Sequence, residues 1–158
     1  MAGRGSPAGG LEGASPAGNS ARADGAGDVL SAVTTKSAPA AIGPYVQGMS
    51  VTGGCRLIFT SGQLPLDPAS GAFVGGGIAE EARQALGNAL AILAGAGART
   101  EDVVRSTIYL VDMTTYPTVN EVYEHVFEGH LPARTVVGVS ALPRGANLEV
   151  ELVAAVRV

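Results

Sequence analysis

The chain has 158 residues, 46% of them hydrophobic and 15% charged, with a formal net charge of −4, which suits one globular domain with a sizeable core. The acidic balance argues against a nucleic-acid-binding protein, which needs a basic stripe, and no apolar run is long enough to cross a membrane. The single cysteine, Cys55, excludes a disulfide within the chain, and with the missing signal-peptide pattern it leads us to expect a cytoplasmic protein.

The first segment, residues 1–33, is rich in Gly, Ala, Ser and Pro and nearly lacks large side chains. Such a segment cannot bury enough apolar area to offset its chain entropy, so we expect a disordered tail. A transit peptide is the alternative, which the acidic residues Glu12, Asp24 and Asp28 disfavour. The folded domain is therefore expected to cover residues 34–158.

Two short strands are expected to follow a loop rich in Pro and Gly. Residues 45–51 alternate weakly between apolar and polar, and residues 56–61 form a second β-like run. Gly53-Gly54 between them is typical of a hairpin turn, so we expect the two strands to pair. Residues 62–77 then form a long loop.

Apolar residues at helical spacing predict helices over residues 78–96 and 115–128. Runs rich in β-branched residues predict strands over residues 102–111, 131–140 and 147–153. The resulting order, ββαβαββ, predicts an α+β fold with a single mixed sheet and both helices packed on one face. The other face would be bare in a monomer. We expect Val136, Val150 and Leu152 to meet a partner subunit there.

Arg134 is the only charge in the apolar run 131–140. A guanidinium is costly to bury unless something pairs with it, and its planar fork fits a carboxylate. That carboxylate could belong to Glu149 or Glu151 on a neighbouring strand, or to a small substrate. The residue pattern leaves both alternatives open.

Other candidate groups carry weaker signals. Glu149 and Glu151 lie two apart on one strand and so share a face, which is either solvated or places a carboxylate that handles a proton. Tyr45 follows a stiff Gly-Pro pair and either packs at an edge or lines a site. Ser61 has no neighbouring base, which favours a hydrogen-bonding role over a nucleophilic one.

Metal ligation is not expected. His125 and His130 match no usual zinc spacing, and no nearby acidic residue completes one. We therefore predict no metal site.

Five stretches of the chain, in order, resemble the RidA (YjgF) family of reactive imine/enamine deaminases. They are residues 38–48, 60–65, 118–123, 132–134 and 148–151. The resemblance covers residues 35–158 and implies a chorismate-mutase-like fold and a homotrimer with active sites between subunits. It also implies metabolite damage control, in which 2-iminopropanoate, 2-iminobutanoate and their enamine tautomers are hydrolysed to 2-keto acids and ammonia without a cofactor.

The same resemblance implies a role for each matched residue. Arg134 binds the substrate carboxylate, Glu149 lies near the attacking water, Tyr45 and Ser61 line the pocket, and the carbonyls of Gly62 and Val136 hold the water. Some members carry cysteine at the position of Val136, a harmless change if only the carbonyl acts there. A non-catalytic ligand-binding or chaperone-like trimer is the alternative, and a ribonuclease or translation inhibitor is disfavoured by the acidic charge.

Overall fold

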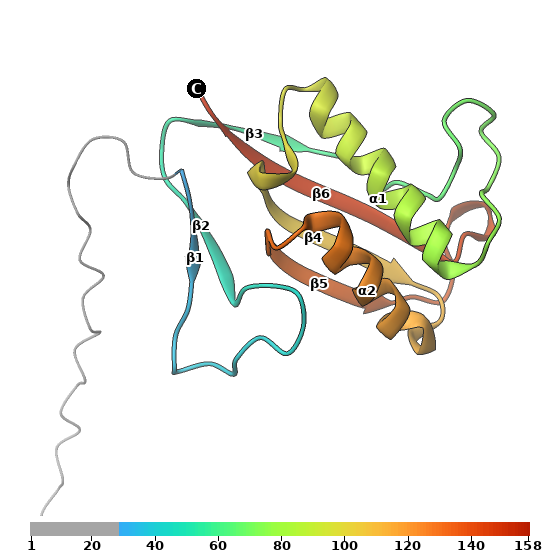
Figure 1. The fold of residues 1–158 in the computed structure, drawn as a ribbon, viewed down its shortest axis with the longest axis horizontal. Coiled ribbons are helices and arrows are strands. Elements are labelled where there is room, and N and C mark those ends of the chain that lie inside the picture. The colour runs from blue at the N-terminus through green and yellow to red at the C-terminus, as the bar shows by residue number, and fades with distance from the viewer. Residues whose placement is uncertain (1–28) are drawn as a thin grey trace, which may run out of the picture.

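The computed structural model describes residues 29–158 and has one main mixed sheet (Figure 1). Its strands, in spatial order, are β3 (Cys55–Phe59), β6 (Leu148–Arg157), β4 (Val103–Leu110) and β5 (Ala133–Gly138). β6 pairs antiparallel with both β3 and β4, whereas β4 pairs parallel with β5. Two helices, α1 (Ile78–Gly95) and α2 (Tyr116–Phe127), pack on one face of this sheet. The predicted α+β class is confirmed.

The core lies between the two helices and the sheet. The buried positions of α1 recur at helical spacing and are mostly small, which lets the helix approach the sheet closely: Ala82, Ala85, Leu86, Ala89 and Leu93. Neither helix, nor any other helix within residues 29–158, has the length and apolarity needed to span a membrane.

The predicted placement of Val136, Val150 and Leu152 on the bare face of the sheet, where a partner would cover them, is wrong. Val150 and Leu152 are fully buried beneath the helices, and Val136 packs against the same core. Because side chains alternate along a strand, the bare face instead carries Glu149 and the other residues between the buried ones. The apolar residues of β6 therefore face the helices.

A separate two-stranded sheet precedes the main one. β1 (Leu30–Val33) pairs antiparallel with β2 (Gly48–Val51), so the predicted hairpin across Gly53-Gly54 does not form. β3 pairs instead with β6, which is ten residues long and extends well past the predicted end at residue 153. Because β6 is this long, every residue of β3 has a backbone partner on it. With β3 paired in this way, the main sheet has four strands.

The tail prediction fails at its C-terminal end. Residues 30–33 form β1 and therefore belong to the fold, because β2 supplies the partners that their sequence alone lacks. The rest of the predicted tail, residues 1–28, lies outside the described residues.

The neighbours Leu93 and Ile92 on α1 provide a test of this packing. Leu93 is fully buried, whereas 42% of Ile92 is exposed. We expect Leu93→Ala to lower the free energy of unfolding by about 2–5 kcal/mol, because it opens a cavity in the core. Ile92→Ala should lower it by less than about 1 kcal/mol. Denaturant unfolding at a fixed chain concentration measures both, and equal losses would contradict the packing described.

Candidate active site

Arg134 lies on β5, the edge strand of the main sheet, on the face toward the helices. Its register partner is the buried Ser106 of β4, which fixes this orientation. Three tyrosine rings surround its guanidinium carbon, with ring centroids at 5.5 Å for Tyr45, 5.8 Å for Tyr116 and 4.7 Å for Tyr123. These distances suit cation–π attraction, which stabilises a cation without neutralising it.

No acidic side chain pairs with Arg134 among residues 29–158. The two ion pairs found there are Arg83 with Glu80 and Arg99 with Asp102. Within the described part of the chain, the Arg134 side chain makes one hydrogen bond, from Nη2 to the hydroxyl oxygen of Tyr116, at 3.3 Å. The structure therefore does not contain the internal ion pair with Glu149 or Glu151 that the sequence left open.

A pocket of about 360 Å³ opens beside this guanidinium. It is lined by Tyr45, Met113, Tyr116, Arg134, Thr135 and Val136. Three of the six predicted site residues, Arg134, Tyr45 and Val136, are thus brought together. The pocket is large enough for a small organic acid and presents it with one positive charge.

A glycine makes the approach of Tyr45 to Arg134 feasible. The loop turns tightly here, because the Tyr45 N–H donates to the Gly43 carbonyl at 2.8 Å. A Cβ atom at Gly43 would lie only 3.3 Å from Nη2 of Arg134, closer than such contacts usually are. Gly43 therefore contributes to the site in two ways: it allows the tight turn before Tyr45, and it leaves room for the Arg134 guanidinium.

Sequence reasoning missed the roles of Tyr116 and Tyr123. They are seven residues apart on α2, which places them on one face two turns apart. The spacing was visible, but only the packing of α2 beside β5 shows that this face meets Arg134. Tyr123 is fully buried and accepts a hydrogen bond from Ser106 Oγ at 3.0 Å. Burial raises the pKa of Tyr123 to about 12.

The other three predicted site residues form a second group. Glu149 of β6 lies so close to Gly62 that any side chain at position 62 would collide with its carboxylate. The Gln63 Nε2 group donates to the carbonyls of Gly62 at 3.1 Å and of Ser61 at 3.3 Å. The absence of a side chain at Gly62 is therefore required for the observed position of Glu149. The side chain of Ser61, the third residue of this group, is exposed.

These two groups lie on opposite faces of the main sheet. Arg134 is in register with Ser106, whereas Glu149 is in register with Tyr109, three residues further along β4. Odd separations along a strand put side chains on opposite faces. Within one protomer, the six predicted residues therefore form two separate groups.

Glu151, on the same face as Glu149, has a local partner. The Tyr109 hydroxyl donates to its carboxylate at 3.3 Å. Burial, followed by the charge of Glu151, raises the pKa of Tyr109. Glu151 is therefore held by a hydrogen bond, and Glu149 is the freer of the two carboxylates.

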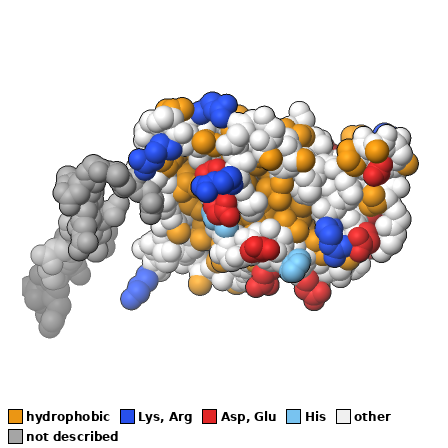
Figure 2. Space-filling view, turned by 45° about the horizontal axis from the view of Figure 1, so that its top comes forward, with side chains coloured by type: hydrophobic (Ala, Val, Ile, Leu, Met, Phe, Trp, Pro, Cys, Tyr) orange, Lys and Arg blue, Asp and Glu red, His pale blue; other side chains and the backbone are white. Residues whose placement is uncertain are grey.

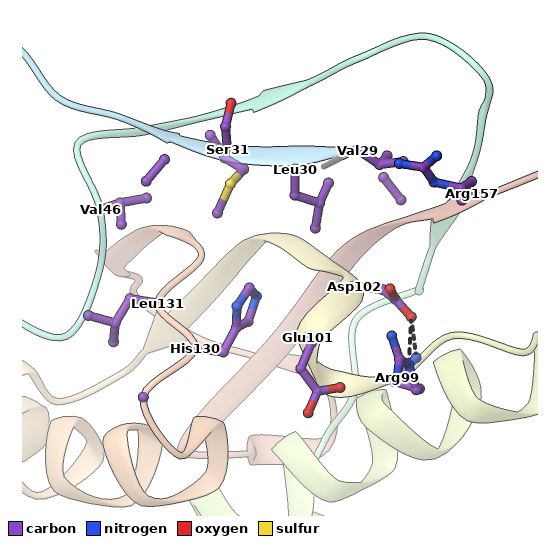
Figure 3. Close-up of a pocket in the computed structure, with 14 residues that line it drawn as sticks. Val29, Leu30, Ser31, Val46, Arg99, Glu101, Asp102, His130, Leu131 and Arg157 are labelled. Carbon is purple, nitrogen blue, oxygen red and sulfur yellow. Dashed lines mark hydrogen bonds and ion pairs between the residues drawn. The ribbon is translucent and has the colours of Figure 1, made fainter. Parts of the chain in front are cut away.

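A larger cavity, of about 740 Å³, lies between β1 and the end of the main sheet, with Leu30 and His130 on opposite walls (Figure 3). None of the six predicted site residues lines it. Three of its polar side chains are engaged locally, since Arg99 pairs with Asp102 at 3.7 Å and His130 Nε2 contacts the Val103 carbonyl at 2.7 Å. Among residues 29–158, no group of three or more potential ligands could hold a metal ion.

Comparison with known proteins points to one family. A family model described as endoribonuclease L-PSP matches residues 35–156. The 2-iminobutanoate/2-iminopropanoate deaminase of Mus musculus is 50% identical over 122 residues, covering 77% of this chain and 88% of that protein. The protein of the same name from Escherichia coli K12 is 42% identical over 125 residues, covering 77% and 94%. The structure of E. coli TdcF with bound serine is 38% identical, with a TM-score of 0.61, covering 80% and 98%.

The raised pKa of Tyr123 predicts a change of stability at high pH. An unfolded tyrosine ionises near pH 10, whereas folded Tyr123 keeps its proton up to a pKa of about 12. The stabilisation is complete below pH 10 and is lost as the pH rises toward 12. We expect the wild type to lose roughly 2–3 kcal/mol more unfolding free energy over this interval than Tyr123→Phe. Parallel pH profiles for the two proteins in denaturant titrations would disprove this assignment.

Proposed function

Since the chain belongs to the endoribonuclease L-PSP family, which includes the RidA (YjgF) proteins, we propose that it is a 2-iminobutanoate/2-iminopropanoate deaminase. The family predicted from the sequence is thereby confirmed. Relatives that carry this name match the chain over most of their own length. The proposed activity is the hydrolysis of small 2-imino acids.

The observation that carries the proposal is the guanidinium of Arg134, which faces a pocket and has no acidic partner among residues 29–158. A half-buried cation without a counter-charge is unfavourable unless a ligand supplies one. The carboxylate of a 2-imino acid supplies it and can bind the planar fork through two hydrogen bonds. Arg134 thereby selects small acids and fixes the position of their C=N carbon.

The reaction needs positioning and proton transfer more than a strong nucleophile. Water adds to the C=N carbon, a proton moves to nitrogen, and the resulting carbinolamine loses ammonia to leave a 2-keto acid. An imine is already electrophilic, so a carboxylate that accepts a proton from water and returns it to nitrogen provides effective catalysis. We assign this role to Glu149, and none of these steps requires a cofactor.

The remaining predicted residues complete this assignment. The Gly62 carbonyl accepts one hydrogen bond from Gln63, which leaves its second lone pair for the attacking water. The carbonyl of Val136 and the side chains of Tyr45 and Ser61 keep the roles that the family resemblance implies. With valine at position 136, regulation through a thiol at that position is absent.

Arg134 and Glu149 must come from different copies of the chain to act on one substrate. This follows from their positions on opposite faces of the sheet. The bare face supports association, because 68% of Phe59 and 49% of Leu57 are exposed there. We propose a homotrimer with the active sites at the protomer junctions.

The proposed role is metabolite damage control in the cytoplasm, a location with which a single cysteine is compatible. The family model's description raises a ribonuclease as the second candidate. RNA binding requires a basic surface. The net charge is −4, and Figure 2 shows acidic and basic side chains interspersed on the face displayed. We therefore favour the deaminase.

A coupled assay tests the proposed activity. A serine or threonine dehydratase generates the imine, and the release of 2-keto acid and ammonia is followed with and without this protein. We expect Arg134→Ala to lower kcat/KM at least about 100-fold, because it removes a charge-assisted bidentate contact. Glu149→Gln should lower kcat more than it weakens binding of 2-oxobutanoate. Wild-type rates in Arg134→Ala would refute the role of Arg134.

Mixing two inactive variants tests the shared site. If Arg134 and Glu149 come from different subunits, random trimers of Arg134→Ala and Glu149→Gln chains contain intact sites. Equal mixing after subunit exchange should restore about a quarter of the wild-type activity, the chance that both contributors to a site are intact. Separate incubation without exchange is the control. No recovery in proven mixed trimers would place both residues in one protomer's site.

A further inference from the structure

Asn88 of α1 connects this helix to the loop that follows Gly62. Its Nδ2 donates to the main-chain carbonyls of Leu64, at 3.1 Å, and of Leu66, at 2.8 Å. Its Oδ1 accepts from Nε2 of Gln84, four residues earlier on the helix, at 2.8 Å. The amide nitrogen of this half-buried side chain therefore directs its donors at one loop.

The stretch that Asn88 holds has otherwise local hydrogen bonds. The Leu66 N–H donates to the Leu64 carbonyl at 2.8 Å, and the Val74 N–H donates to the Pro65 carbonyl at 3.0 Å. Both of these bonds stay within the loop between β3 and α1. Asn88 thus supplies a polar connection between this loop and the helix that covers the sheet.

The same loop begins at the residues that surround the Glu149 carboxylate. Gly62 is the position where any side chain would collide with that carboxylate. The next residue, Gln63, pairs with Val150 of β6 through backbone hydrogen bonds of 2.7 and 3.0 Å, one in each direction. Gly62 is therefore positioned by two connections, from Gln63 to β6 and from the following residues to α1 through Asn88.

We propose that Asn88 is a positioning residue of the deaminase, which holds the loop after Gly62 against α1 and thereby places the Gly62 carbonyl and the Glu149 carboxylate for the attack of water. Asn88 bonds to the loop and to neither of these groups, so it acts through them. The inference rests on the proposed function, in which Glu149 transfers protons and Gly62 holds the water.

An amide suits this position because two carbonyl oxygens face one nitrogen. Carbonyl oxygens only accept hydrogen bonds, so the side chain between them must present two donors. Aspartate has the same shape but presents a charged acceptor, which both carbonyls repel. Alanine leaves the two carbonyls without their partner on the helix. A displacement of about 1 Å in a positioned group can lower a rate by roughly 100-fold.

Substitution of Asn88 separates catalysis from ligand binding. We expect Asn88→Asp to lower kcat for imine hydrolysis about 10–100-fold, and Asn88→Ala about 3–10-fold. The Kd of 2-oxobutanoate, measured by calorimetry, should stay within about threefold, because Arg134 is unchanged. Leu93→Ala is the matched control, since it weakens the buried side of the same helix without touching the loop. Where it is folded, its kcat should stay within about twofold of the wild type.

Mixed trimers test whether Asn88 acts on the same group as Glu149. A chain with Asn88→Asp keeps an intact Arg134, so subunit exchange with Arg134→Ala chains should restore about a quarter of the wild-type activity. Exchange with Glu149→Gln chains should give no more than the residual activity of Asn88→Asp, because no chain then carries a working Glu149 group.

Three results would overturn the inference. The first is a kcat of Asn88→Asp within about twofold of the wild type, and the second is an equal loss in kcat and in binding of 2-oxobutanoate. The third is recovery of activity with Glu149→Gln chains in proven mixed trimers. If Asn88→Asp does not fold, Asn88→Ala takes its place in each measurement.

Amide hydrogen exchange lets the two proposals fail separately. The Gln63 amide, which bonds to the Val150 carbonyl, should exchange at least about 10-fold faster in Asn88→Asp than in Leu93→Ala. A wild type that hydrolyses no imine refutes the deaminase, and faster exchange then still supports the connection through Asn88. A wild type that hydrolyses imines, with Gln63 exchange and kcat unchanged in Asn88→Asp, refutes only the role of Asn88.

Discussion

The candidate site depends on a positive charge that the fold holds without neutralising it. Arg134 is surrounded by the rings of Tyr45, Tyr116 and Tyr123, which attract the cation but carry no counter-charge. An ion pair within the chain would stabilise the guanidinium better and would also abolish its affinity for a ligand. The tyrosines therefore keep the arginine in place while its charge stays available.

The fold accounts for this arrangement. β5 is the edge strand of the main sheet, so one side of Arg134 is not enclosed by a further strand. The small buried face of α1 lets both helices pack on the sheet, which brings α2 beside β5. The tyrosines of α2 then contact the guanidinium from the helix side. The turn at Gly43, in the loop before β2, places the Tyr45 ring against the same guanidinium. Residues far apart in the sequence meet because of this packing.

Much of this could be predicted from the sequence, and the failures have physical causes. The period of the apolar residues located both helices and the strands at 102–111 and 131–140, because local spacing determines them. The same information could not decide which strand β3 pairs with, since strand pairing depends on distant segments. It also missed β1, whose four residues acquire partners only from β2. For the site, the lone charge of Arg134 is conspicuous in the sequence, whereas Tyr116 and Tyr123 resemble ordinary helix positions until α2 is placed against β5.

The separation of Arg134 and Glu149 by the thickness of one sheet has a consequence for how the activity responds to dilution. If each catalytic centre needs groups from two polypeptides, a solitary chain is inert however well folded it is. Turnover then depends on mass action between subunits, and it falls more steeply than chain concentration below the dissociation constant of the assembly. The amount of protein made by a cell would thus set the onset of activity as well as its extent.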